Sequence, residues 1–528
     1  KVEWSTFSVK LPFFSRIWAR DRKIFKGVFP NLGSKIVKEG KMHIKRTFKS
    51  IGLVLGVILL VANWLACTKR VEKGNVLKIW NWNVSDEPFL RKMFKEFEEE
   101  HPGIKIQYTC QVGGMYDQML SLAFKVGEPP DMFLPTANLT TTILVEKGWV
   151  IPYDSCAPNK EALEAWKAQF SPKLFAFKEG GNVINGKTYT FPFKGITAGG
   201  TFYYNKTLFR KAGLVDENGE PTPPRTWSEF RRYARIITQA GKGRFYGFAM
   251  GMQRPWVLGM NVTQLAWPDG HPFVQIDFRK GRYCYDHPNI KRALRLLMDI
   301  DADGSILPGA ITMTDETAKR AFATDNAAMI IGGPWNVTNT LVYNPDADFD
   351  VAPPPHPDDV KIRCVAFRTR ESGGGFGYLV SSSTKHRDMC WELAKFFVSR
   401  KFQKAMVKAG VGVSIYSDLN TPENFAHPAW AKIAKWGLEA KIIPTESLAV
   451  TKVKKDFLEP VHPNFEETLQ GIWVGKLSMD ALDKVNEEMN AALERAILKA
   501  QQAGVKVTKE DFIFPDWIPC VDYLPAER

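Results

Sequence analysis

Residues 181–188, "GNVINGKT", have the residue types and spacing of a loop whose backbone N–H groups and lysine hold nucleotide phosphates. Such a loop must lead into a helix, because the helix N-terminus supplies those N–H groups. Here the aromatic, β-prone residues 189–193, which include a proline, follow instead. Asn185 and Gly186 suit the two positive-φ positions of a type I′ turn. We therefore predict a β-hairpin here and no nucleotide chemistry.

Residues 299–305, "DIDADGS", place aspartates at positions 1, 3 and 5 and a glycine at position 6 of a calcium-binding loop. The bidentate glutamate expected at position 12 is replaced by Ala310, and Pro308 interrupts the loop. The segment is better explained as the end of a helix. The sequence predicts no metal site and no cofactor.

Enzyme motifs are otherwise few. The sequence contains no G-x-S-x-G or H-E-x-x-H, and several of its eight histidines lie beside prolines, as in loops. A glycosidase, however, needs only two suitably spaced carboxylates, and 57 acidic residues leave such a pair open. From these residues alone, a binding protein and a glycosidase both remain possible.

The net charge of +14 is concentrated near the start of the chain. Residues 1–66 hold 13 Lys/Arg and 3 Asp/Glu, which leaves 58 against 54 in the remaining 462 residues. No basic stripe interleaved with aromatic residues occurs in that remainder. This distribution argues against nucleic acid as a partner.

A targeting signal accounts for the basic start. Residues 42–50 are basic, and the sixteen residues 51–66 are uncharged and mostly apolar, which fits a signal peptide at 42–66 better than a membrane span. The following Cys67 resembles the lipidated cysteine of a bacterial lipoprotein, with 67–74 as a linker; an uncleaved signal anchor is the alternative. We interpret residues 1–41 as an extension upstream of a start at Met42.

Seven cysteines occur in the chain. If Cys67 carries lipid, the other six could form up to three disulfides in an oxidising compartment, with 15 possible pairings. None of these pairings follows from the sequence. Buried free thiols are the alternative.

Hydrophobic periodicity predicts alternating strands and helices downstream of the signal. Strands at 76–80, 104–108 and 132–134 are separated by a helix that ends before His101 and by a helix at 115–126. This order implies a mainly parallel sheet with crossover helices. Further helices are predicted at 226–239, 290–299, 314–323, 387–397, 428–438 and 479–502.

Seven sequence blocks then resemble, in order and approximate spacing, the extracellular solute-binding proteins of bacterial ABC sugar importers. They include "INGKTYTFPF" and "AAMIIGGPWNV" and lie at 127–133, 146–154, 184–193, 203–214, 223–238, 327–337 and 373–397. The resemblance implies an α/β, two-lobed, periplasmic-binding-protein-like (type II) fold with hinge crossovers near 194–200, 368–373 and 438–445. Lobe 1 would comprise 75–196 and 372–440, and lobe 2 would comprise 197–371 and 441–528.

The resemblance also implies a function. The protein would capture a sugar or oligosaccharide in the cleft between its lobes by hinge closure and deliver it to the transmembrane subunits of a permease. It would be an exported monomer at the periplasm or cell surface, anchored to the membrane through Cys67, and not an enzyme. The alternative is an exported glycosidase-like enzyme.

Candidate ligand-binding residues follow from strand ends and from the resemblance. Ligands of open α/β sheets bind beyond the carboxyl ends of strands, which selects Trp82 and Asn83 after the first strand, although side-chain alternation also allows a core role for Trp82. Trp335 follows an apolar strand in "GGPW", and in the resembling family the tryptophan of a "GPW" run commonly stacks on sugar.

Other candidates depend more heavily on the resemblance. Asn138 lies beyond the "PPDMFL" strand, where related proteins often place a polar residue near the ligand. Gly373 and Gly374 would line the second crossover, and Glu446 would lie near the third.

Overall fold

The computed structural model describes residues 75–524 except 112, 137, 172–173, 176, 178, 180, 198, 268–274, 361–366 and 370–376. The predicted signal, Cys67, Gly373 and Gly374 therefore lie outside the described residues. Residues 75–528 form one compact unit. Within the described ranges, no helix combines the length and apolar character needed to cross a membrane.

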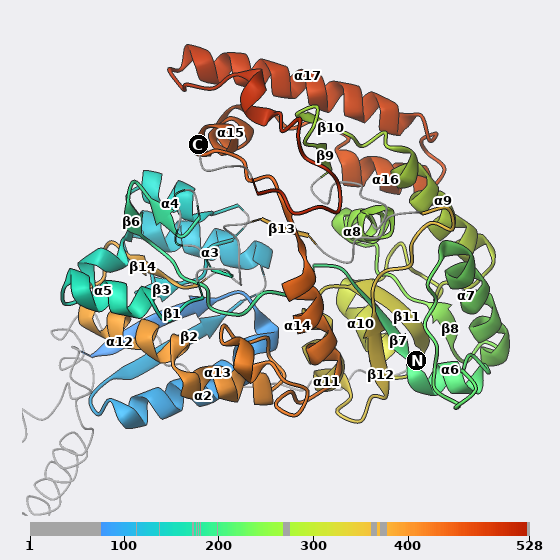
Figure 1. Cartoon of the computed structure of the whole chain (residues 1–528), viewed down its shortest axis with the longest axis horizontal. Coiled ribbons are helices and arrows are strands. Elements are labelled where there is room, and N and C mark those ends of the chain that lie inside the picture. Colours follow the sequence, from blue (N-terminus) through green and yellow to red (C-terminus); the bar gives the residue numbers. More distant parts are fainter. Residues whose placement is uncertain are drawn as a thin grey trace, which may run out of the picture. The chain divides into compact units, whose positions relative to one another are not determined.

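The first sheet has the strand order β2-β1-β3-β14-β4 (Figure 1). Strand β1 pairs in parallel with β2 and β3, whereas β14 runs antiparallel to both β3 and β4. The predicted parallel order is confirmed for the first three strands, and β14 joins the sheet from much later in the chain. The strands are β1 (Val76–Asn81), β2 (Lys105–Cys110), β3 (Met132–Phe133), β4 (Val150–Ile151) and β14 (Leu379–Ser381).

Two buried clusters cover this sheet. One contains the apolar faces of α2 and α12, and the other contains residues of α3 and α4. Helix α2 presents Phe89, Met93 and Phe97 at helical spacing, so its burial follows from its sequence. The helical elements of this region are η1 (Val84–Asp86), α2 (Glu87–Glu100), α3 (Gly113–Val126), α4 (Thr141–Glu146), η2 (Tyr153–Ser155), α5 (Lys160–Lys167), α12 (Arg387–Val398), α13 (Arg400–Lys408) and η4 (Ser417–Leu419).

The second sheet has the order β12-β7-β11-β8. Strand β11 runs parallel to β8, and β7 runs antiparallel to β11 and β12. Every residue of β7 and β11 is buried, as expected for strands covered on both faces. The strands of this region are β7 (Thr201–Asn205), β8 (Tyr246–Phe248), β9 (Ile276–Asp277), β10 (Arg282–Tyr283), β11 (Ala327–Gly332) and β12 (Phe349–Ala352).

Helices around the second sheet include several predicted from sequence. Thr226 caps α7 with Glu229 in a reciprocal capping box, close to the predicted start. The helices here are α6 (Lys206–Lys211), α7 (Trp227–Gly241), α8 (Pro255–Ala266), α9 (Pro288–Ala302), α10 (Asp315–Ala323) and α11 (Trp335–Tyr343). Helix α9 ends at Ala302 and Gly304 has φ 66°, so the calcium-loop look-alike is a helix end, as predicted.

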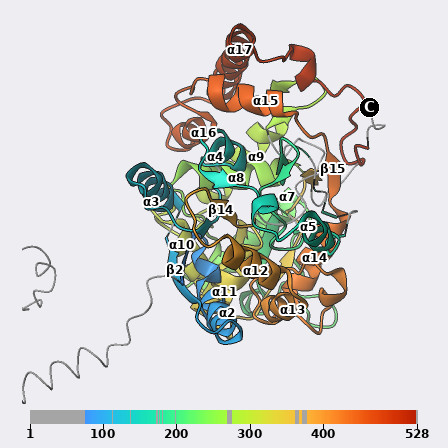
Figure 2. The ribbon, with the colours of Figure 1, turned by 90° about the vertical axis from the view of Figure 1, so that its left-hand side faces the viewer.

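The C-terminal helices lie together (Figures 1 and 2), and their buried residues belong to the same apolar cluster as residues of the second sheet. Helix α17 contacts both α16 and η5. The final described residues return to β15, where the Tyr523 N–H donates to the carbonyl of Ile442 at 2.9 Å. These elements are β15 (Lys441–Ile443), α15 (Leu448–Lys452), η5 (Val453–Phe457), α16 (Phe465–Trp473), α17 (Ala481–Gln502) and η6 (Lys509–Phe512).

The packing of α13 and α14 (Ala429–Glu439) bears on the third crossover, which the sequence predicts near 438–445. Helix α14 falls within the predicted lobe 1, but Trp430 and Ile433 pack in a cluster with Tyr203 of the second sheet. Helix α13 contributes Phe402 and Met406 to the first sheet's cluster and Val407 to the cluster with Tyr203. The segment from α13 to α14 thus passes from one cluster to the other, ahead of the predicted crossover at 438–445.

The hairpin prediction is confirmed. Strand β5 (Val183–Ile184) pairs antiparallel with β6 (Lys187–Thr188). Asn185 and Gly186 have φ values of 52° and 71°, both positive as a type I′ turn requires. Outside the two main sheets and the hairpin, strand β13 (Phe367–Thr369) pairs in parallel with β15.

Cysteine chemistry is mixed in the described residues. Cys110, Cys156 and Cys390 are free thiols, and the last two of these are buried. Burial raises the pKa of Cys110 to about 11 and keeps that thiol protonated near neutral pH. Cys520 is disulfide-bonded.

Candidate functional site

The first-sheet edge is the edge at which β1 and β3 end. Because these strands are parallel neighbours, their carboxyl ends lie together. Trp82 follows β1, and its indole N–H donates to the carbonyl of Pro135, just beyond β3, at 2.9 Å. The ring is half-buried and packs against both apolar clusters of this sheet. Trp82 therefore ties the two strand ends together and keeps part of its ring exposed.

Asn83 belongs to a short polar turn anchored to the interior. Its backbone N–H donates to the side-chain oxygen of Asn81 at 2.8 Å, and its own side-chain oxygen accepts from Ser85 at 2.7 Å. Three residues on, Asp86 is buried and pairs with Lys194 Nζ at 2.7 Å. Burial raises the pKa of Asp86, while the charge of Lys194 acts in the opposite direction.

Asn138 is exposed at the same edge, after β3. Its side-chain N–H donates to Asp117 Oδ2 at 2.8 Å, and the Thr136 hydroxyl donates to Asp117 Oδ1 at 2.5 Å. Asp117, on the first turns of α3, was not identified from the sequence. The carboxylate retains lone pairs for further donors, so this group can accept hydrogen bonds from a polyhydroxyl ligand.

The second-sheet edge is the edge at which β8 and β11 end. These strands are also parallel neighbours, so their carboxyl ends meet. Trp335 is the first residue of α11, separated from the end of β11 by Gly333 and Pro334, and it is 41% exposed. A Cβ atom at Gly333 would lie 2.2 Å from the Trp335 ring, so only glycine allows this ring to fold back over the backbone.

Trp256 is a second exposed tryptophan at this edge, and the sequence reasoning missed it. It follows Pro255 in the first turn of α8, in the connection that begins where β8 ends, and it is 43% exposed. The overlooked signal is the Pro-Trp pair, which starts both α8 and α11. Pro255 is the first residue of α8 and Pro334 is the cap of α11, positions that suit proline. The tryptophan that follows each proline is partly exposed.

The remaining predicted residues are less informative. Glu446 follows β15 and is half-buried, and its carboxylate forms an ion pair with Lys454. Burial lowers the pKa of Lys454. Gly373 and Gly374 lie outside the described residues, so the predicted glycine lining of the second crossover has no structural account.

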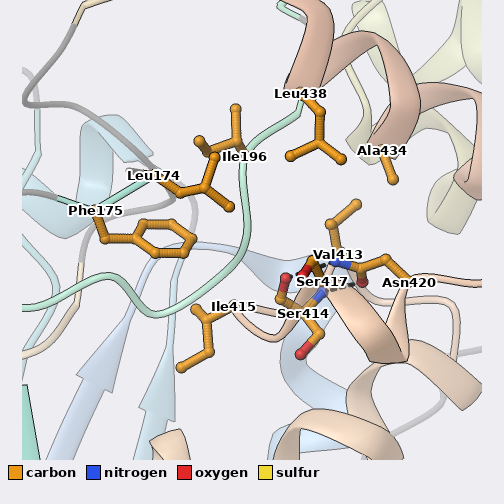
Figure 3. Close-up of a pocket in the computed structure, with 10 residues that line it drawn as sticks. All are labelled: Leu174, Phe175, Ile196, Val413, Ser414, Ile415, Ser417, Asn420, Ala434 and Leu438. Atoms are coloured by element: carbon orange, nitrogen blue, oxygen red, sulfur yellow. Dashed lines mark hydrogen bonds between the residues drawn. The ribbon is translucent and has the colours of Figure 1, made fainter. Parts of the chain in front are cut away.

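A small pocket lies at the crossovers rather than at either sheet edge (Figure 3). Ile196 of the first crossover lines it, together with Ala434 and Leu438 of α14 and the segment 413–420. The Gly195 N–H donates to the carbonyl of Val413 at 2.6 Å, so two chain passages lie side by side here. None of the predicted ligand-binding residues lines this pocket.

Two polar contacts join α15 and η5, which pack with the second sheet, to α4, which packs with the first. Lys452 pairs with Glu146 of α4 at 3.1 Å, and Lys455 donates to the Thr140 hydroxyl at 2.7 Å. Helix α11 also contacts η1. The segments that carry Trp335 and Asn83 are thereby close in space.

Comparison with known proteins gives a family match over most of the chain. Residues 81–404 match the model of the family described as bacterial extracellular solute-binding protein. A stretch of 257 residues is 27% identical to the sn-glycerol-3-phosphate-binding periplasmic protein UgpB of Escherichia coli (strain K12). That stretch covers 47% of this chain and 54% of the E. coli protein, about half of each.

Solved structures show the same fold. An ABC transporter solute-binding protein from Thermotoga lettingae, bound to α-D-tagatose, matches with a TM-score of 0.58 and 22% identity, covering 80% of this chain and 100% of that one. The GacH receptor of Streptomyces glaucescens, studied unliganded and with acarbose, matches with a TM-score of 0.60 and 19% identity, covering 80% and 99%. The predicted two-lobed type II fold is confirmed.

Proposed function

This chain belongs to the family of bacterial extracellular solute-binding proteins, and from that membership we propose that it captures a sugar or oligosaccharide between its lobes for an ABC importer. The closed, loaded protein would present its ligand to the transmembrane subunits of the permease. Binding energy would come from closing the two sheet edges on the ligand, because a ligand that contacts both lobes favours the closed state over the open one.

The observation that carries this proposal is the pair of exposed tryptophans at the second-sheet edge. Trp256 and Trp335 follow parallel neighbouring strands and leave about two fifths of each side chain in solvent. Exposed indole rings at the carboxyl end of a sheet suit a ligand with flat C–H faces, and sugar rings have such faces. Apolar packing alone would bury them.

The first-sheet edge supplies the polar part of the proposed site. Asp117 and Asn138 form a bonded pair, and Asn83 lies on the neighbouring strand end. Carboxylate and amide groups bind the hydroxyls of a sugar ring from its edge. Glu446, although already paired with Lys454, and the glycines at 373 and 374 stay predicted members of the site.

We propose lobe boundaries that follow the packing. Lobe 1 comprises 75–196 and the segment from 372 to the α13–α14 connection. Lobe 2 comprises 197–371 and the chain from α14 onward. The hinge would then include the passages at 194–196 and 411–415, which are joined by the Gly195 to Val413 hydrogen bond.

We also propose that the protein is an exported lipoprotein, anchored through Cys67 after removal of the signal at 42–66. Cys67→Ser should release the protein from membranes in a fractionation experiment. Persistent membrane attachment of this variant would instead support an uncleaved anchor.

A binding screen tests the proposed function directly. The purified protein should show a raised melting temperature with at least one member of a library of neutral sugars, polyols and phosphorylated polyols, because a ligand held only by the folded state stabilises it. Chromatography of the same samples should recover the ligand unchanged. Failure of every library member would contradict the proposed function, and cleaved glycans would favour the glycosidase alternative.

A further inference from the structure

Glu466 stands out among the acidic residues near the second-sheet edge. It is the second residue of α16 and is half-buried. Among the described residues, its carboxylate has no ion pair and no hydrogen bond to another side chain. Burial raises its pKa. Its own backbone N–H donates to the carboxylate, and the remaining lone pairs of this partly desolvated group could accept hydrogen bonds from a ligand.

The position of Glu466 is fixed by its neighbours on α16. Phe465 is buried and stacks on Tyr285 with ring centroids 4.5 Å apart. One helical turn beyond Glu466, the Gln470 side chain donates to the carbonyl of Met252 at 2.8 Å. The face of α16 that carries Glu466 is thereby held against the chain that leads into α8.

Glu466 lies directly on α8, one turn from Trp256. A Cβ atom at Gly259 would be 2.8 Å from Glu466 Cγ and 3.6 Å from its Oε1, so the acidic side chain occupies the space above that glycine. Trp256 and Gly259 are three residues apart on α8 and share a face of the helix. The carboxylate and the exposed ring are therefore neighbours on the same surface.

A second carboxylate, that of Glu467, acts on Glu466. The titratable groups that act on it or respond to it are Glu467 and Tyr285. Arg254, at the cap of α8, acts instead on Asp315. A phosphate group placed on Trp256 would meet an unneutralised carboxylate, whereas a sugar hydroxyl would meet an acceptor.

We propose that Glu466 is a ligand-binding and specificity-determining residue, whose carboxylate accepts hydrogen bonds from the hydroxyls of a sugar stacked on Trp256 and disfavours phosphorylated ligands. This inference depends on the proposed sugar-binding function. It predicts that the ligand is a neutral sugar or polyol rather than a phosphorylated polyol such as the one named for the E. coli relative. Glu466 would thus add an acceptor for sugar hydroxyls to the second-sheet edge, beside the rings of Trp256 and Trp335.

Calorimetry with chosen probes tests the inference. The neutral sugar or polyol that stabilises the protein most is titrated into wild type, Glu466→Gln and Glu487→Gln. Glu487 is an exposed acid of α17 and provides the matched loss of one charge. Glu466→Gln should weaken binding about tenfold or more, since hydrogen bonds to charged groups are the stronger ones, and Glu487→Gln should leave it unchanged. Gly259→Ala, which displaces the Glu466 side chain, should weaken binding in the same direction.

A second titration uses the phosphate monoester of that ligand. Wild type should bind the neutral compound more tightly than its phosphate monoester. Glu466→Gln should reduce the difference between these two affinities. Unchanged neutral affinity in Glu466→Gln would overturn the inference while sugar binding stands. Tighter binding of the phosphorylated compound by wild type would also overturn it, with solute binding intact. Failure of all neutral compounds to bind would overturn both proposals.

Discussion

The two sheet edges differ in how their candidate ligand-binding side chains are held. At the first edge, Trp82 is tied to Pro135 and half-buried, and the polar groups of Asp117 and Asn138 are bonded to one another. At the second edge, Trp256 and Trp335 stand in solvent. The side chains of the first edge are therefore held by bonds within the protein, and in the proposed site they would set the ligand's orientation. The second edge leaves apolar ring area exposed, which the proposed ligand would cover.

The largest expected effect concerns the support of the first edge. Lys194→Met leaves Asp86 buried without its cation and should lower the free energy of unfolding by about 3 kcal/mol. Chemical denaturation measures this loss, and Lys187→Met on the exposed hairpin strand is the control.

This stability loss should depend on pH. Burial favours the protonated form of Asp86, and removing Lys194 strengthens that preference. A carboxyl with a raised folded-state pKa gives stability at low pH that is lost as pH rises. The defect of Lys194→Met should thus shrink as the pH falls. A defect that grows with acidity would show that Asp86 is not the group left unpaired.

The next effect tests the exposed rings. Trp335→Ala and Trp256→Ala should each weaken ligand binding by about 1–3 kcal/mol, as loss of ring stacking commonly does, with the fold intact. Calorimetry measures the affinity and circular dichroism checks the fold. Trp335→Phe should restore part of the loss. Unchanged affinity for either alanine variant would remove that ring from the site.

A smaller effect is expected for the polar pair. Asp117→Asn removes the negative acceptor that Thr136 and Asn138 share and should weaken binding by about 1 kcal/mol. If this loss equalled or exceeded that of Trp335→Ala, the proposed division of roles between the edges would be wrong.

The smallest effect concerns the hairpin. Lys187→Ala should leave ligand affinity and melting temperature unchanged within error, because Lys187 is exposed on β6 and pairs with Ile184 across the hairpin. Nucleotide binding that disappears with this lysine would revive the phosphate-loop interpretation.

Sequence periodicity predicted the helices that have one apolar face, such as α2 and α7, because a single buried stripe repeats at helical spacing. It missed α8, whose residues from Val257 onward are buried nearly all round and show no such stripe. Missing α8 also hid Trp256 at its start.

The candidate site was predictable only in part for a related reason. Trp82, Asn83 and Trp335 lie at or just beyond strand ends, so the rule of strand ends selects them as candidates. The proposed role of Asp117 depends on Thr136 and Asn138, and that of Glu466 on Gly259, in each case across a contact that no local pattern encodes. The packing of α14 with Tyr203 likewise depends on residues distant in sequence.

The narrow passage at residue 195 limits which sequences this protein can tolerate. A Cβ atom there would lie 2.2 Å from the carbonyl oxygen of Ser414, so any larger residue would push apart two chain segments that lie outside the proposed site. In the proposed hinge, natural variation at this position would alter the angle between the lobes and leave the proposed ligand contacts unchanged. A screen restricted to contact residues would overlook such variants.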